Sequence, residues 1–158
     1  MIVLFFGQPA SGKTTLAKSY INNRVFKHNE NRSTYIHIDG DNWRLITNNV
    51  NYSKEGRMQN LKSAFNMALF LEKEGFIPIL SFVTPYKELR NYLAGKANKL
   101  VQIYLFYDQE RGRTNLFAKD FEVPDGEFAS NELLEINTSY ISIVDPVTML
   151  EKYISEKK

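Results

Sequence analysis

Short apolar runs alternate with longer stretches of helical periodicity along this chain of 158 residues. The apolar runs are rich in β-branched and aromatic residues, as is typical of buried strands, and they are Ile2–Phe6, Thr34–Ile38, Phe76–Phe82, Leu100–Tyr107 and Leu134–Ile136. The helical stretches between them are Ser11–Asn23, Asp41–Thr47, Ser53–Glu74, Lys87–Ala97, Gln109–Ala118 and Pro146–Glu156. Because strands that alternate with helices indicate βαβ units, the pattern predicts an α/β fold with three layers around a parallel sheet of about five strands.

One apolar run and the absence of linkers refine this prediction. Pro78 falls inside the run Phe76–Phe82. A proline lacks the backbone N–H and is tolerated at the start or edge of a strand, so this strand is expected to begin one or two residues late. The chain contains no internal repeat, low-complexity tract or linker, so residues 1–158 are expected to form one domain.

Composition and charge exclude several classes of protein. Hydrophobic residues make up 43% of the chain and charged residues 24%, the balance of a globular protein. The chain contains no cysteine, which rules out disulfides and thiolate chemistry and fits a reducing cytoplasm. Met1–Phe6 lacks the features of a signal peptide, and no apolar stretch approaches the length that spans a bilayer. A net charge of only +2 is too small to indicate a nucleic-acid partner. Together, these features predict a cytoplasmic protein with no nucleic-acid or membrane partner.

The segment Gly7–Thr14 matches the phosphate-binding loop G-x-x-x-x-G-K-[ST] at every fixed position. A strand is predicted before it and a helix after it, which is the context that the motif requires. Glycines let the backbone N–H groups turn toward a phosphate, and the start of the helix favours an anion. The alternative, a glycine turn with a solvated lysine, does not account for the full motif. The expected ATP-binding residues here are Gly7, Ala10, Ser11, Gly12, Lys13, Thr14 and Thr15.

Two common classes of phosphate-loop protein fit the rest of the chain poorly. A GTPase would carry Asn-Lys-x-Asp after a strand, whereas residues 98–101 lack the aspartate and precede a strand. An ATPase motor would place an acid at the end of the third strand, where Leu80–Phe82 has none. The carboxylates follow the second strand instead, as Asp39 and Asp41. We therefore expect these two aspartates to supply both the magnesium-binding acid and the catalytic base.

Asp39 and Asp41 can divide the work of a phosphoryl transfer. One carboxylate, together with the Thr14 hydroxyl, can hold Mg²⁺ or its water, and the other can take the proton of an attacking hydroxyl. We expect Asp39 and Thr14 at the metal and Asp41 as the base. Asp41 could equally cap the helix predicted to follow it, since aspartate is a favoured N-cap residue.

Four blocks together resemble the adenylyl-sulfate kinases in order and approximate spacing over about residues 1–110. They are Gly7–Leu16, Asp39–Arg44, Tyr52-Ser53 with Arg57 and Asn60, and Ser81–Tyr86. The resemblance implies a P-loop nucleotide-kinase fold. It also implies transfer of the γ-phosphoryl group of Mg·ATP to the ribose 3′-hydroxyl of adenylyl sulfate, which gives 3′-phosphoadenylyl sulfate.

The same resemblance implies roles for individual residues. Asp41 and Lys13 would be catalytic, with Asp39 beside them. Acceptor-binding residues would be Arg44, Tyr52, Arg57, Asn60, Val83 and Phe121. The arginines suit a phosphosulfate because a guanidinium matches oxyanions in a bidentate way. Arg57 could instead be a solvated helical arginine and Tyr52 a loop aromatic packed on the core.

The region from about 108 to 130, which the resemblance makes a lid, departs from the family. The stretch Thr114–Phe121 is several residues shorter, Thr114 stands where the family has a lysine, and no Phe-Thr-Gly motif follows. Phe121 remains as the candidate stacking aromatic, with Phe117 and Phe128 behind it. Arg111 and Arg113 are expected to contact the ATP phosphates when the lid closes.

These departures leave the acceptor open. Adenylyl sulfate is the leading hypothesis, and another nucleotide 3′-hydroxyl, such as that of cytidine diphosphoramidate, is the alternative. A nucleotide-binding module without turnover is a third reading, although such a module needs no base. A homodimer is possible because family members often form one. Two isolated histidines, His28 in a polar loop and His37 in the second strand, make no metal site.

Overall fold

A computed structural model describes residues 1–126, 133–139, 142 and 144–156 of the chain. Its parallel sheet has the strand order β2-β3-β1-β4-β5, with β1 Ile2–Phe6, β2 Tyr35–Asp39, β3 Ile77–Phe82, β4 Leu100–Phe106 and β5 Leu133–Asn137. The helices are α1 Lys13–Lys27, α2 Gly40–Thr47, α3 Lys54–Lys73, α4 Lys87–Ala94 and α5 Val144–Ser155, with short 3₁₀ turns η1 Arg32–Thr34 and η2 Thr114–Leu116. None of the described helices is long and apolar enough to cross a membrane.

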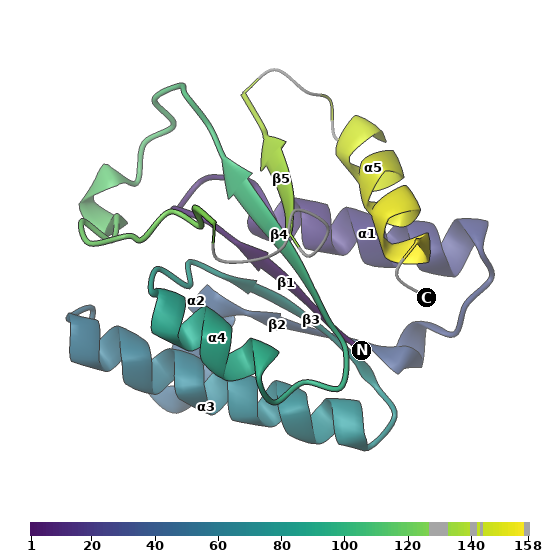
Figure 1. Ribbon diagram of the computed structural model, residues 1–158, viewed down its shortest axis with the longest axis horizontal. Coiled ribbons are helices and arrows are strands. Elements are labelled where there is room, and N and C mark those ends of the chain that lie inside the picture. Colours follow the sequence, from purple (N-terminus) through teal and green to yellow (C-terminus); the bar gives the residue numbers. More distant parts are fainter. Residues whose placement is uncertain (127–132, 140–141, 143, 157–158) are drawn as a thin grey trace.

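Helices cover both faces of the sheet, so the predicted three-layer α/β fold is confirmed. In Figure 1, α1 and α5 lie on one face and α3 and α4 on the other. The strand β1 supplies both cores because its side chains alternate between the faces. Val3 and Phe5 pack with α1 and α5, whereas Leu4 and Phe6 pack with α3 and α4. This two-sided burial is why β1 is a continuous apolar run.

The order of the strands places a crevice at the end of β1. Its neighbours are β3 on one side and β4 on the other, and all pairings are parallel. In such sheets ligands bind beyond the carboxyl ends of the strands, where the strand order reverses. The phosphate loop leaves the sheet there.

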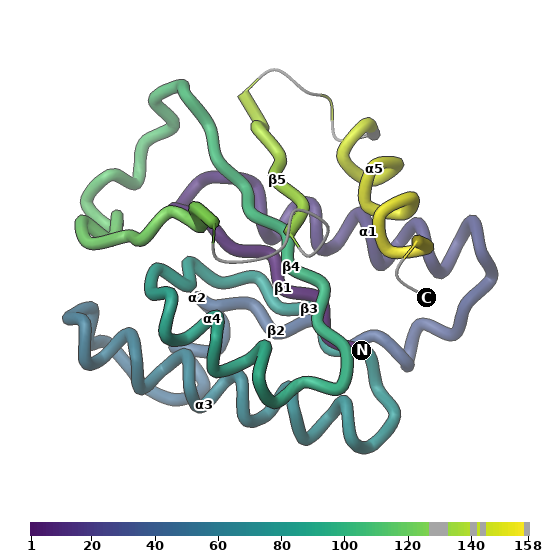
Figure 2. The backbone as a smooth tube through the Cα atoms, viewed as in Figure 1, coloured from purple at the N-terminus to yellow at the C-terminus, as the bar shows by residue number. Residues whose placement is uncertain are grey.

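The predicted helix over Gln109–Ala118 is wrong. Only η2 is helical in that stretch. Gly112 and Arg113 have φ angles of +70° and +57°, and two successive left-handed residues cannot continue a right-handed helix. As Figure 2 shows, the chain leaves β4, makes a long excursion and returns beside the start of α4. There Glu122 N donates to Pro85 O at 2.8 Å.

Other boundaries differ by a few residues. The helix α1 runs to Lys27, four residues past its predicted end, and α4 ends at Ala94 because Gly95 closes it. The third strand does begin late, at Ile77, and Pro78 is its second residue.

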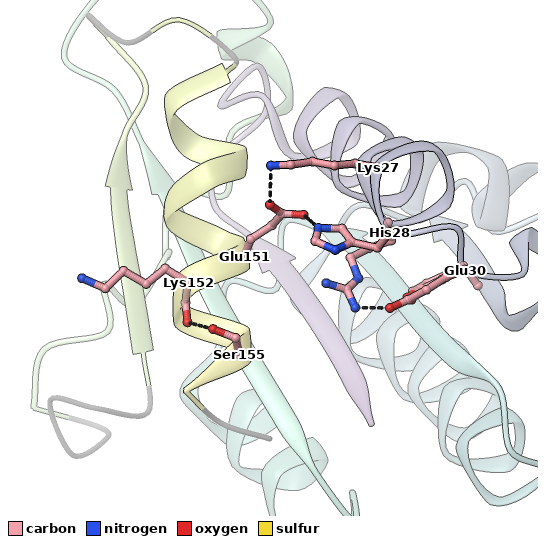
Figure 3. A network of polar contacts seen from close by, with 8 residues as sticks. Lys27, His28, Glu30, Glu151, Lys152 and Ser155 are labelled. Carbon is pink, nitrogen blue, oxygen red and sulfur yellow. Dashed lines mark hydrogen bonds and ion pairs between the residues drawn. The ribbon is translucent and has the colours of Figure 1, made fainter.

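An ion-pair cluster fastens α5 to the end of α1. Glu151 of α5 points toward α1 and contacts His28 Nε2 at 2.8 Å and Lys27 Nζ at 3.5 Å (Figure 3). His28 is thus partly exposed and has an acidic partner on α5. This cluster lies away from the carboxyl ends of the strands and serves the packing of α5.

Candidate active site

The phosphate loop has the backbone shape of an anion cradle. Gly7 has a φ angle of +144°, and a Cβ atom there would lie 2.0 Å from Leu105 O, so only glycine fits. Ala10 and Gly12 have φ angles of +65° and +94°. Gly12 is also the N-cap of α1, and no side chain caps that helix end. The first amides of α1 are thereby left for a ligand with negative charge.

Lys13 lies inside this loop, with an exposed fraction of 9%. Its Nζ donates to Gln8 O at 2.7 Å and to Ser11 Oγ at 3.3 Å. Burial lowers the pKa of Lys13 to about 7, and the positive charge of Arg113 adds to this effect. The Lys13 amine is therefore partly neutral near pH 7, and a bound anion would favour its charged form.

Asp39 is the polar centre at the end of β2. Its Oδ2 accepts hydrogen bonds from Thr14 Oγ1 at 2.6 Å and Ser81 Oγ at 3.0 Å. Its Oδ1 accepts from the backbone N of Asp41 and Asn42. Burial alone would raise the pKa of Asp39, but these hydrogen bonds outweigh it and hold the pKa below its usual value. The carboxylate therefore stays ionised beside the threonine of the loop.

Asp41 is not the cap of the following helix. That cap is Asp39, and Asp41 lies in the first turn of α2 with 70% of its side chain exposed. Its Oδ2 lies 3.2 Å from Nη2 of Arg113, which comes from the segment after β4. The competing explanation for Asp41 is therefore removed, because another residue does the capping.

Two arginines lie close to one aromatic ring in the part of the site formed by α2, α3 and the loop between them. The guanidinium carbons of Arg44 and Arg57 lie 4.2 and 5.7 Å from the ring centre of Tyr52. Arg44 Nη1 donates to Asn49 O and Asn51 O. Among the ion pairs of the described residues, none involves either arginine. Burial, assisted by the charge of Arg57, lowers the pKa of Arg44, so an anionic ligand would relieve both effects.

Arg57 is buried rather than solvated, with an exposed fraction of 9%. Its Nε donates to Tyr52 O at 2.9 Å, and its Nη2 donates to Leu116 O of η2 at 3.3 Å. A second link joins the same segment to the phosphate loop, because the Gln8 amide both donates to Ala118 O and accepts from Ala118 N. The segment after β4 thereby contacts both Arg57 of α3 and the phosphate loop.

A single cleft of about 290 Å³ joins these groups. Most of the residues predicted for the site line it: Ala10, Gly12, Lys13, Thr14, Thr15, Asp39, Asp41, Arg44, Tyr52, Arg57, Asn60 and Val83. Gly7 and the buried Ser11 shape the loop from behind. Val83 is half-buried at the wall, so it is not simply a core residue.

Arg111 and Phe121 lie elsewhere. Arg111 lines a smaller cavity with Gly12 and Thr15, where it donates to Thr138 Oγ1 at 2.9 Å. Phe121 stacks on Tyr104, with ring centres 6.0 Å apart, and packs against the apolar core. It is not among the residues that line the cleft. Phe128 is outside the described residues.

Several lining residues were not predicted for the site. Leu116 reaches it from the segment after β4, Ser81 from the end of β3, and Thr84 from the loop that follows. Arg113, which was expected at the ATP phosphates, also lines the cleft. Ser81 carried a usable signal, since it is a polar residue near the end of a buried strand. Thr84 has a φ angle of +43°, which is uncommon for a β-branched residue and not visible in the sequence.

The comparisons with known proteins agree with this geometry. Residues 1–119 match the family described as adenylylsulphate kinase. The chain belongs to this family. The adenylyl-sulfate kinase of Staphylococcus epidermidis is 26% identical over 98% of this chain and 84% of its own length. That of Clostridium kluyveri is 31% identical over 66% of this chain, which spans about half (52%) of that relative.

Solved structures show the fold of this adenylylsulphate kinase family member. The APS kinase CysC of Mycobacterium tuberculosis in complex with AMPPNP and APS has a TM-score of 0.78 at 17% identity, over 98% of this chain and 96% of that one. A gluconokinase from Sinorhizobium meliloti has a TM-score of 0.61 at 13% identity, over 99% and 96%. The predicted P-loop kinase fold is confirmed.

The residues present fit Mg·ATP. The uncapped start of α1 and the left-handed loop residues form a cradle for phosphates. Thr14 and Asp39 present oxygen atoms side by side, and Mg²⁺ prefers oxygen ligands. The described residues contain no cluster of three metal-binding side chains. Such a cluster is not required, because Mg²⁺ is usually bound by one or two protein groups together with substrate phosphates.

Proposed function

We propose that this protein is an ATP-dependent kinase that phosphorylates the ribose 3′-hydroxyl of a nucleotide, with adenylyl sulfate as the acceptor and 3′-phosphoadenylyl sulfate as the product. One observation carries the proposal. A single cleft is lined by Lys13 and Thr14 of the phosphate loop, by Arg44 and Arg57, and by Asp41. The charge of Asp41 acts on both Lys13 and Arg44.

Each group has a defined task in this proposal. The loop amides and Lys13 bind the β- and γ-phosphates of ATP, and Thr14 and Asp39 hold the magnesium ion. When bound, magnesium supplies charge neutralisation at the transferred group. Asp41 accepts the proton of the 3′-hydroxyl as its oxygen bonds to the γ-phosphorus, while the bond from that phosphorus to the β–γ bridging oxygen breaks and ADP leaves. The cavity that Arg111 lines adjoins the loop and accommodates a further part of ATP.

The acceptor part supports a nucleotide that carries an anionic tail. Arg44 and Arg57 present two guanidinium groups whose partners on the protein include backbone carbonyls, which leaves their charge for a phosphosulfate. Tyr52 is 47% exposed and offers a face to a base. Asn60 is 4% exposed and also lines the cleft, where its amide can bind a polar edge of the ligand.

Steady-state transfer from ATP to adenylyl sulfate and to cytidine diphosphoramidate, measured in parallel, tests the proposal. We expect turnover of adenylyl sulfate. Turnover of the cytidine compound alone would show that the short segment after β4 has changed the acceptor. Binding of ATP without transfer to either nucleotide would refute the kinase assignment and favour a binding module.

A further inference from the structure

A half-buried histidine, His37, lies behind the end of the cleft that is proposed to bind magnesium. Side chains alternate along a strand, so His37 and Asp39 project from the same face of β2. Ser81 of β3 is the partner of Asp39 in the parallel register. The strands therefore place an imidazole, a hydroxyl and a carboxylate next to one another on the face that α1 covers. Thr14, in the first turn of α1, completes the row.

These four side chains form one continuous chain of hydrogen bonds. His37 Nε2 lies 2.8 Å from Ser81 Oγ, Ser81 Oγ lies 3.0 Å from Asp39 Oδ2, and Thr14 Oγ1 lies 2.6 Å from the same oxygen. An ionised carboxylate can only accept, so Ser81 donates its single hydrogen to Asp39. The serine oxygen is then the acceptor for His37, and Nε2 must carry a hydrogen.

The direction of this chain has a consequence for Asp39. A hydroxyl that itself accepts a hydrogen bond is a better donor, because neighbouring hydrogen bonds polarise one another. The imidazole also keeps the Ser81 hydroxyl from rotating toward the solvent of the cleft. The charged groups that act on His37 besides Asp39 are Lys18 of α1 and Arg32 of η1. Donation by Nε2 is the same in the neutral and the charged ring.

We propose that His37 is a positioning residue that acts through Ser81 to hold the Asp39 carboxylate in the orientation that binds the magnesium of Mg·ATP. The idea rests on the proposed function, since it assigns His37 to support of the same metal. Partners behind a metal-binding group typically change metal affinity or activity by about 10–100-fold when removed. His37 touches neither nucleotide in this scheme, so ATP binding without magnesium should be indifferent to it.

The ligand-free protein offers the first test. Nitrogen-15 NMR of the histidine rings reports which nitrogen carries the hydrogen. We expect the Nε2–H form for neutral His37 and a change in its Nε2 signal in Ser81→Ala. A neutral ring with its hydrogen on Nδ1 would overturn the proposal, because the ring would then accept rather than donate.

Binding of a non-hydrolysable ATP analogue, titrated with magnesium, is the second test. In His37→Leu we expect the half-saturating magnesium concentration to rise about tenfold, with analogue binding in EDTA unchanged. Ser81→Ala should show the same shift, and the double variant should be no worse than either single one. His37→Gln, whose amide can donate in place of Nε2, should recover most of the loss. His28→Leu, the same change at the α1–α5 cluster, is the matched control.

Two further results would overturn the proposal: additive effects in the double variant, or a lower melting temperature in His37→Leu with an unchanged magnesium titration. The titration needs no turnover. A protein that binds Mg·ATP but phosphorylates no nucleotide would therefore refute the proposed function while still answering this question.

Discussion

The two halves of the cleft are built in different ways. The phosphate half is one continuous segment, in which β1 is buried on both faces and glycines carry the backbone around an anion. The acceptor half is assembled from distant segments, since Arg44 lies on α2, Arg57 on α3 and Leu116 on η2. Side chains that donate to backbone carbonyls hold these pieces together.

This difference teaches where each half is open to change. The phosphate half tolerates little, because a Cβ atom at Gly7 would collide with Leu105 O. The acceptor half can change when one segment changes length, and the match to the family ends at residue 119, inside the segment after β4. Substitutions in the two halves should therefore act on different kinetic constants.

The largest effect is expected where the two halves meet. Asp41→Asn removes the proton acceptor but keeps the shape, so we expect kcat to fall about 10³-fold with little change in either KM. Steady-state kinetics with both substrates varied would measure it. Glu88→Gln, which alters an exposed carboxylate on α4, is the control. A drop of less than about tenfold in Asp41→Asn would show that another group takes the proton.

The second effect isolates the phosphate half. Lys13→Met should lower kcat by about 10²-fold, because a cation at the transferred group is lost. The pKa of Lys13 is about 7, below its ordinary value of 10.5. The folded protein thus binds fewer protons than the unfolded chain between these values, and this group makes ligand-free stability rise with pH over that window.

The same pKa predicts a proton linked to binding. At pH 8 Lys13 is mostly neutral, and bound phosphates should favour its protonated form. The protein should therefore take up close to one proton when ATP binds. Calorimetry in buffers of different ionisation enthalpy would count it. The uptake should vanish in Lys13→Met. Uptake that persists in that variant would assign the proton to another group.

The third effect isolates the acceptor half. Arg57→Lys keeps the charge but loses the planar fork that spans Tyr52 O and Leu116 O. We expect the KM of the acceptor to rise about tenfold while the KM of ATP stays the same. Arg32→Lys, at an arginine that donates to Tyr35 O in β2, is the matched control. An equal rise in both constants would contradict the division into halves.

The smallest effect lies outside both halves. Glu151→Gln weakens the contacts to His28 and Lys27, of which Lys27 is 64% exposed. Such exposed pairs are worth about 0.5–1 kcal/mol. Chemical denaturation should show a loss of that size in the free energy of unfolding, with kcat unchanged. A change in kcat would mean that the packing of α5 reaches the site.

The sequence predicted the phosphate half well for a physical reason. Its signal is local, because strand, glycine loop and helix follow one another within Ile2–Lys27. All five strands were also placed within one residue at each end. The runs of β1, β3 and β4 are buried on both faces and are therefore hard to mistake.

The acceptor half was predictable only in part. The resemblance placed Arg44, Arg57, Tyr52 and Asn60 in the cleft, but periodicity alone could not have brought α2 and α3 together. Periodicity also predicted a helix over Gln109–Ala118, where residues with left-handed backbone angles form a loop instead. Phe121 was expected at the ligand, yet it packs on Tyr104. Composition cannot distinguish a stacking aromatic from a core aromatic.

The position of the transferred phosphate tests the central claim most directly. After a single turnover with ATP and adenylyl sulfate, phosphorus–proton couplings in the product's NMR spectrum would locate the new phosphate. If Asp41 accepts the proton of the ribose 3′-hydroxyl, as we propose, the new phosphate will be found on the 3′-oxygen alone. A phosphate on any other oxygen of the acceptor, or free phosphate from hydrolysis of ATP, would contradict the account.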